Sequence, residues 1–515
     1  MRLVGQYPVL SACLLLLVSA GCSNRMPEQS PGTGFDPEAT TQATTASATN
    51  VTTTGSSATV AGSTSGAGGS TSGSTGTQTS STGTVPSSVT SSVGGTGGAS
   101  TTGELSSTTG SLGGRGPTPA TATANFPFPQ NRESPHCVYP ALYSNADVRA
   151  LYEAWKADLV TSEGAGGFRR VARVAEPGLE PNSTVSEGIA YGMLISVYMD
   201  DQALFDDLYK YALLYTWTYQ SDTGSDATLL MNWYIHADGN IAPGGGSDPA
   251  GNGAATDADE DIAFALVMAD RQWGGAGSLE RGYIEYARDL IDDIWAYEIA
   301  DERLPKNGSN WGSDTNLNIS YFAPAYYRVF AEVTGDTRWS TNVVDYIYTV
   351  IDNNLNAGNG NDANGLVPAW SQSNGSPAES QGGMAYHYQY DSCRTPFRIG
   401  QDACWHAEAR AVAYVSKTSQ FFAGIGVVNI VDGYELDGTP RPEFPDRFGG
   451  LSGAFIGPAA VGAMHSGSFA SFVDDAYALA RQNNAWAGGQ YYDESWLMMS
   501  VLMMTGNFLD YTQYD

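Results

Sequence analysis

The sequence predicts a mainly α-helical protein that follows a long low-complexity segment. Beyond residue 125, apolar residues recur every three or four positions in many stretches. Regular alternation suited to long strands is scarce, and Gly, Asn, Asp and Ser fill the intervals. The first 125 residues hold almost no aromatic side chains, although the chain has 11 Trp, 29 Tyr and 17 Phe. We therefore expect the folded region at residues 126–515, as one large domain or two closely joined ones.

Residues 1–21 have the features of an export signal. Arg2 gives a basic start, and the apolar run VLSACLLLLVSAGC ends in small residues. The junction before Cys22 resembles a bacterial lipobox, in which Cys22 becomes the lipidated first residue. Ordinary secretion with cleavage nearby is the alternative, and the run is short for a membrane span. We expect an exported protein, either secreted or anchored in the cell envelope through Cys22.

Residues 22–125 form a Ser-, Thr- and Gly-rich segment, as in GSTSGAGGSTSGSTGTQTSSTG. Such a composition buries too little apolar surface to offset the entropy lost on ordering. We expect a disordered tether.

The formal net charge is −30 at pH 7. Nucleic-acid binding needs clustered Lys and Arg, so we expect no nucleic-acid partner. An acidic field would favour a cationic substrate, but an acidic extracellular surface explains the same charge.

Amphipathic spacing defines the expected helices. In SNADVRALYEAWKADLV, apolar residues from Val148 to Leu159 fall three or four apart. Together with similar stretches this predicts about a dozen helices joined by long loops. The further stretches are 186–198, 202–217, 259–273, 278–299, 320–334, 338–354, 396–418, 468–482 and 494–505.

Three cysteines lie in the folded region: Cys137, Cys393 and Cys404. In a helix from Pro396, Cys393 and Cys404 would stand roughly 16 Å apart, too far for a bridge, which needs Cα atoms within about 7 Å. Cys137 is thus the expected partner of one of them, with Cys137–Cys404 as the candidate disulfide. Three unpaired buried thiols are the alternative.

The stretch ATDADEDIAFALVMADRQW crowds four carboxylates before an apolar helical stripe. A calcium loop starting at Asp257 would need Gly at its sixth position and Glu at its twelfth, where Ile262 and Met268 stand. A capping box between Asp257 and Glu260 is the structural explanation.

Two more carboxylates stand in unusual settings. Glu187 begins a helix in NSTVSEGIAYGM, where glycines permit a close approach of a neighbouring backbone or a ligand. Asp391 lies in HYQYDSCRTPFRIG, close to Arg394, where a salt bridge is the alternative explanation.

Together these motifs resemble glycoside hydrolase family 8, also called cellulase family D. SEGIAYGM, ATDADEDIAFALVMADRQW and YDSCRTPFRIG match its elements in order, and LMNWYIHADGN, LNISYFAPAYYRVF and YYDESWLMMSVLMMTGNF extend the match over nearly all of residues 130–515. The resemblance implies an (α/α)6 barrel that cleaves β-1,4 linkages in polysaccharides with inversion. An inverting enzyme needs a protonated acid and an ionised base roughly 6.5–9.5 Å apart.

By motif position, the resemblance implies Glu187 as general acid and Asp391 as general base, although some subgroups carry the base elsewhere. It assigns Asp257 to the sugar at the cleavage point. Asp259, Glu260 and Asp261 then shape and support the helix start. Burial and nearby carboxylates are expected to raise the pKa of Glu187.

The resemblance also indicates sugar-binding side chains, since pyranose rings have apolar faces that pack on aromatic rings. Arg394 would orient Asp391 or a sugar hydroxyl. Plain core packing is the alternative for each aromatic. No metal or cofactor is expected, because the five histidines are not spaced as a zinc site. The aromatic candidates are Trp233, Trp311, Tyr390 and Tyr491.

We therefore expect a monomeric, inverting, endo-acting β-1,4-glucanase. A chitosanase or xylanase of the same family is an alternative, and a non-catalytic carbohydrate-binding surface protein is another. The last would predict loss of a carboxylate, yet Glu187, Asp257 and Asp391 are all present.

Overall fold

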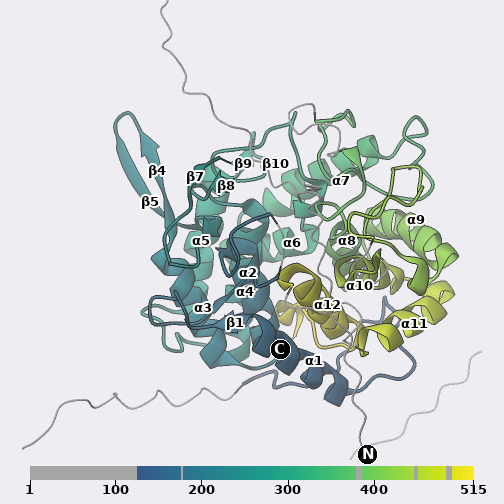
Figure 1. The fold of residues 1–515 in the computed structure, drawn as a ribbon, viewed down its shortest axis with the longest axis horizontal. Coiled ribbons are helices and arrows are strands. Elements are labelled where there is room, and N and C mark those ends of the chain that lie inside the picture. Colours follow the sequence, from purple (N-terminus) through teal and green to yellow (C-terminus); the bar gives the residue numbers. More distant parts are fainter. Residues whose placement is uncertain are drawn as a thin grey trace, which may run out of the picture. The chain divides into compact units, whose positions relative to one another are not determined.

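The structure is a computed structural model that describes residues 124–175, 178–246, 248–378, 386–445, 450–482 and 490–514. The predicted signal at 1–21, Cys22 and residues 22–123 of the predicted tether lie outside the described residues. The described part contains twelve α-helices, α1 to α12, which alternate along the chain between an outer and an inner position (Figure 1).

The inner helices form a closed ring. Each one contacts the next in the series, and α12 contacts α2. Figure 1 shows these six helices in the middle of the folded region. They are α2 (Ser186–Tyr198), α4 (Thr256–Trp273), α6 (Pro324–Thr334), α8 (Thr395–His406), α10 (Gly453–Ala463) and α12 (Tyr491–Met504).

The outer helices surround this ring, and each packs on an inner helix that adjoins it in the chain or across the closure. Helix α1, for example, packs on α12, and α3 packs on α2. The outer helices are α1 (Asn145–Leu159), α3 (Gln202–Leu214), α5 (Tyr283–Tyr297), α7 (Val344–Asn354), α9 (Ala409–Ile425) and α11 (Ala470–Ala480).

Side-chain chemistry separates the two rings. Helices α2, α10 and α12 are buried around nearly their whole circumference. Outer helix α5 instead buries one stripe that includes Tyr286, Leu290 and Ile294. A helix that is apolar all round is packed on every side, whereas an amphipathic helix keeps one face in water. The expected (α/α)6 barrel is confirmed.

Some predicted boundaries are wrong. The stretch 396–418 is two helices, because Ala407 adopts a left-handed φ of 52° and ends α8 at His406. Helix α5 begins at Tyr283 rather than at residue 278. Helix α10 has no counterpart among the predictions, because GAFIGPAAVGA contains Pro458 and three glycines and shows no apolar stripe.

The strands in the described residues form five antiparallel pairs. The longest is the hairpin of β4 and β5, which projects from the helices in Figure 1. The pairs are β1 (Val160–Thr161) with β2 (Arg170–Val171), β3 (Thr184–Val185) with β6 (Tyr234–Ile235), β4 (Thr216–Ser221) with β5 (Gly224–Met231), β7 (Pro243–Gly245) with β8 (Asp248–Ala250), and β9 (Ile299–Ala300) with β10 (Leu304–Pro305).

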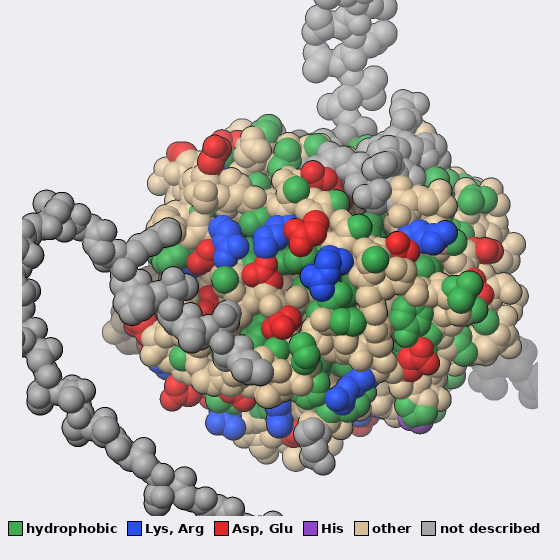
Figure 2. Space-filling view, turned by 90° about the horizontal axis from the view of Figure 1, so that it is seen from below, with side chains coloured by type: hydrophobic (Ala, Val, Ile, Leu, Met, Phe, Trp, Pro, Cys, Tyr) green, Lys and Arg blue, Asp and Glu red, His purple; other side chains and the backbone are tan. Residues whose placement is uncertain are grey.

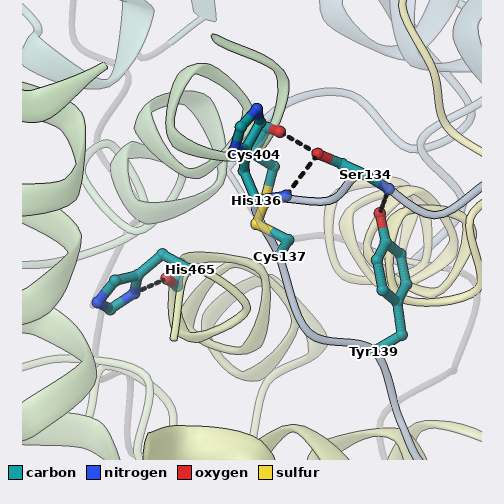
Figure 3. The surroundings of a disulfide bond; sticks show 7 residues. Ser134, His136, Cys137, Tyr139, Cys404 and His465 are labelled. Carbon is teal, nitrogen blue, oxygen red and sulfur yellow. Dashed lines mark hydrogen bonds between the residues drawn. A yellow bond between two sulfur atoms is a disulfide. The ribbon is translucent and has the colours of Figure 1, made fainter. Parts of the chain in front are cut away.

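A disulfide joins Cys137 to Cys404, with their Cα atoms 5.3 Å apart. Figure 3 shows that it ties the segment before α1 to the C-terminal part of α8. Ser134 donates a hydrogen bond to the carbonyl of Cys404, which fixes the same junction. Cys393 is a buried free thiol.

Acidic, basic and apolar side chains are interspersed on the face shown in Figure 2. On that face the excess of acidic residues does not gather into one patch. Among the helices described, none is long and apolar enough to cross a membrane.

Candidate active site

The N-terminal ends of three inner helices each carry one predicted site residue. Glu187 is the second residue of α2, Asp257 is the second of α4 and Tyr491 is the first of α12. Strand β3, which precedes α2, pairs with β6, and the N–H of Ser186 donates to the carbonyl of Trp233 at 2.8 Å. This pairing holds Trp233 beside the start of α2. Helix N-termini carry partial positive charge, which favours carboxylates there.

Arg394 links two of these carboxylates. Its guanidinium is 1% exposed, and its Nη1 donates to Glu187 Oε1 at 2.8 Å and pairs with Asp257. Its Nε donates to Ser320 Oγ at 3.0 Å. The salt bridge of Arg394 with Asp391, which was the alternative explanation, is not formed among the described side chains, where Arg394 pairs with Glu187 and Asp257. A buried guanidinium needs several acceptors, and the starts of α2 and α4 supply two carboxylates.

The carboxyl of Glu187 is crowded by polar groups. The hydroxyl of Tyr491 donates to Oε2 at 3.2 Å, and that of Tyr191 stands 3.5 Å from Oε1. Burial and the neighbouring Asp257 raise the pKa of Glu187 well above its usual range, although Arg394 opposes the rise. Burial and the nearby carboxylate thus both favour the protonated form of Glu187.

Asp391 lies in the loop before α8 and is half-buried. Its Oδ2 accepts hydrogen bonds from Trp370 Nε1 at 3.1 Å and from Gln389 Nε2 at 3.2 Å. Burial raises the pKa of Asp391, while Arg394 and these two donors lower it. The expected rise in the pKa of Glu187 is present. The net shift of the Asp391 pKa is also upward, because burial outweighs Arg394 and the two N–H donors.

Three further acids of α4 are buried behind Asp257. The capping box between Asp257 and Glu260, which was the structural alternative, is not formed, because α4 begins after Ala255 without a side-chain cap. The three acids instead fasten α4 to neighbouring elements. Asp259 accepts from the Met231 N–H at 2.9 Å, Glu260 from the Tyr327 hydroxyl at 2.7 Å, and Asp261 pairs with Arg398.

Glu298, the residue that follows α5, is a buried acid that the motifs do not reveal. It is fully buried, and this burial raises its pKa to about 8, although Lys306 opposes the rise. It also interacts with Thr256 and Asp259 at the start of α4. Glu298 is mostly protonated at neutral pH, so this region avoids one more buried negative charge.

The predicted aromatic side chains have different surroundings. Trp233 is 6% exposed and donates from Nε1 to the carbonyl of Ala250 at 2.8 Å. Trp311 is half-buried beside Trp370, with ring centroids 5.8 Å apart. The hydroxyl of Tyr390 donates to Asp432 at 3.1 Å.

Sequence reasoning missed Trp370, Gln389 and Tyr321. Tyr321 lies in the short helix η1 (Ile319–Tyr321), and the guanidinium of Arg394 stands 4.9 Å from its ring centre. Tyr321 falls within the quoted stretch LNISYFAPAYYRVF, and Gln389 stands two residues before Asp391. Trp370 has no such signal, because only the folded chain brings its loop to Asp391.

Known proteins of one family are similar to this chain over most of its length. The family described as "Glycosyl hydrolases family 8" matches residues 126–506. Endoglucanase A of Acetivibrio thermocellus is 38% identical over 366 residues, which cover 70% of this chain and 70% of that protein. Endoglucanase 2 of Ruminiclostridium josui is 35% identical over 402 residues, which cover 77% and 80%.

A solved structure has a similar fold. The apo structure of beta-1,3-1,4-glucanase from Paenibacillus sp. X4 superposes with a TM-score of 0.64 at 28% identity, covering 75% of this chain and 99% of that one. The family match spans well over half of the chain and contains Glu187, Asp257 and Asp391. The chain therefore belongs to glycosyl hydrolase family 8 and is a glycoside hydrolase.

Proposed function

We propose that this glycoside hydrolase is an inverting, endo-acting β-glucanase that cleaves β-1,4-glucosidic bonds. One observation carries the proposal: Glu187 and Asp391 are two carboxyls with contrasting partners, one beside Asp257 and the other held by N–H donors. Inverting hydrolysis needs one acid protonated and the other ionised.

Glu187 is the general acid. Its raised pKa keeps a proton on the carboxyl, and the proton passes to the glycosidic oxygen as the C1–O bond breaks. The leaving sugar departs as a neutral alcohol. Arg394 and Tyr491 hold the carboxyl in place through this step.

Asp391 is the general base. It removes a proton from a water molecule whose oxygen bonds to C1 from the face opposite the leaving group. The anomeric configuration is therefore inverted. Glu187 then regains a proton from solvent and Asp391 releases one, which completes the cycle.

Asp257 binds the sugar at the cleavage point. It is buried, and its Oδ1 receives no hydrogen bond from the described residues, so this oxygen can accept one from a sugar hydroxyl. Trp233, Trp311 and Tyr390 supply rings for the neighbouring sugars. A buried acceptor with no donor is costly in the free enzyme, and substrate would satisfy it.

The names of the relatives support the choice of polymer. Two relatives at 35–38% identity are endoglucanases, and the similar solved structure is a beta-1,3-1,4-glucanase. We therefore propose soluble β-glucans with 1,4 linkages as the preferred class, with cuts inside the polymer chain.

A substrate panel combined with NMR tests the proposal. Carboxymethylcellulose and lichenan should release reducing sugar and lose viscosity early, as internal cuts require, while chitosan and xylan react more slowly. Proton NMR of the first product formed should show the α-anomer. A β-anomer would refute inversion, and faster release from chitosan or xylan would refute the polymer class.

We also propose that the protein is exported and lipid-anchored at Cys22. The apolar run before Cys22 supports export, and so does the Cys137–Cys404 disulfide, because such bonds persist in oxidising compartments. Labelling with a palmitate analogue in a bacterial host should mark the protein, and Cys22→Ser should abolish the label. An unlabelled wild-type protein in the culture medium would contradict the anchor.

A further inference from the structure

The carboxylate of Asp391 is held from one side only. Trp370 Nε1 donates to its Oδ2 at 3.1 Å, and Gln389 Nε2 donates to the same oxygen at 3.2 Å. Among the described residues, no donor reaches Oδ1. The amide oxygen of Gln389 accepts the backbone N–H of Asp391 at 2.9 Å, so Gln389 binds both ends of this residue.

The loop that carries Trp370 is fixed on both sides of the indole. The N–H of Ala369 donates to the carbonyl of His387 at 2.8 Å. Ser371 and Leu317 exchange two backbone hydrogen bonds, of 3.0 and 2.8 Å. The indole is 8% exposed, and its ring lies 6.5 Å from that of Tyr321. Such support allows a side chain to hold a partner within a narrow range of orientations.

We propose that Trp370, together with Gln389, is a positioning residue that turns Asp391 so that Oδ1 faces the attacking water. The inference rests on the proposed role of Asp391 as base. Two donors on Oδ2 occupy its lone pairs and set the plane of the carboxylate. The free oxygen then accepts the proton from water, and the N–H donors do not themselves touch the sugar or the water.

Other charged groups also act on Asp391. Arg394 at the start of α8 lowers the pKa of Asp391, and Asp257 on α4 raises it. Glu187 on α2 and Glu443 in the 441–445 segment also interact with Asp391, which raises the pKa of each of them. None of these groups is changed when a Trp370 or Gln389 donor is removed, so the effect of the donors can be measured separately.

Trp370→Phe removes the indole donor and keeps an aromatic ring, and Gln389→Met removes the other donor at similar length. Each variant should lower kcat roughly 10- to 100-fold, since small misplacements of a catalytic group have effects of that size, while KM stays within about twofold of wild type. Each should also move the low-pH limb of kcat/KM to higher pH, because a carboxylate that loses a donor is protonated more easily.

Trp311→Phe is the matched control, because it makes the same substitution on the neighbouring ring, whose Nε1 points to the carbonyl of Ala254. It should raise KM and leave the low-pH limb unmoved. A low-pH limb that stays in place in both Trp370→Phe and Gln389→Met would overturn the inference. If Trp370→Phe does not fold, as judged by circular dichroism, Gln389→Met alone decides. The base role itself fails separately, if Asp391→Asn keeps wild-type turnover.

Discussion

The carboxyl groups of Glu187 and Asp391, on the two sides of the candidate active site, have different neighbours. Glu187 sits at the start of a buried helix, against a second carboxylate and a shared guanidinium. Asp391 sits in a loop and is held by the uncharged N–H groups of Trp370 and Gln389. A neighbouring carboxylate favours the protonated form of an acid, whereas N–H donors favour the ionised form. Burial is the largest influence on both pKa values and raises both, so the partner groups supply the contrast between the two carboxyls that the proposed roles of acid and base require.

The largest expected effects come from removing either carboxylate. Glu187→Gln and Asp391→Asn should each lower kcat on soluble β-glucan by about 10²–10⁴-fold, because each removes one proton transfer from the transition state. Both are near-isosteric, so thermal unfolding should stay close to wild type. If either variant keeps kcat within tenfold of wild type, the role proposed for that carboxyl group is wrong.

A smaller effect should follow from Arg394→Met, which alters the Glu187 side. The positive charge of Arg394 lowers the pKa of Glu187, so its loss should raise that pKa further. The high-pH limb of the kcat profile, where the acid loses its proton, should therefore move to higher pH, with kcat lower by about 10- to 100-fold.

Arg398→Met is the matched control for Arg394→Met. Arg398 lies one turn further along α8 than Arg394 and is equally buried, but it pairs with Asp261 of α4. Both variants should be destabilised, by about 3–5 kcal/mol, because Asp257 or Asp261 would keep a buried charge without a partner. An unmoved high-pH limb in Arg394→Met, or an equal shift in both variants, would contradict the role given to Arg394.

The smallest effect on turnover is expected for Glu298→Gln. This variant tests whether the acids buried near the start of α4 lower the stability of the protein at neutral pH. Burial raises the pKa of Glu298 to about 8 from an ordinary value of 4.5. The protonated Glu298 side chain contributes fully to the free energy of unfolding below pH 4.5. This contribution is lost as pH rises to 8, because the unfolded state releases the proton at a lower pH than the folded state does. The variant should therefore gain stability over wild type between pH 5 and 8, by on the order of 1–4 kcal/mol.

Urea unfolding at pH 5 and at pH 8 measures this change. Glu153→Gln on the exposed face of α1 is the control and should keep the wild-type pH dependence. Kcat of Glu298→Gln should stay within about twofold of wild type. An unchanged pH dependence of stability in Glu298→Gln would mean that the carboxyl is already ionised at pH 5.

Sequence reasoning located the helices where apolar spacing was clear. The stretch 186–198 coincides with α2, because its run of apolar residues ends at Asp200 and Asp201. The break at Ala407 was not predictable, since neither Gly nor Pro marks it. Helix α10 was missed because GAFIGPAAVGA contains Pro458 and three glycines, residues that disfavour a helix interior.

The candidate site was predictable to the extent that it lies in local motifs. Glu187, Asp257 and Asp391 each stand in a short recognisable stretch. Their partners depend on the tertiary fold: Arg394 pairs with carboxylates 207 and 137 positions away rather than with Asp391, three positions before it. Trp370 reaches Asp391 across 21 positions. Spacing along a chain does not specify such contacts.

The most direct test of the division of roles uses the leaving group. On a β-cellobioside with a 2,4-dinitrophenyl leaving group, departure needs no proton, so Glu187→Gln should recover to within about tenfold of wild-type kcat. Asp391→Asn should stay as impaired as on the polymer, because water must still be activated. Recovery of Asp391→Asn with no recovery of Glu187→Gln would contradict the assignment of acid and base.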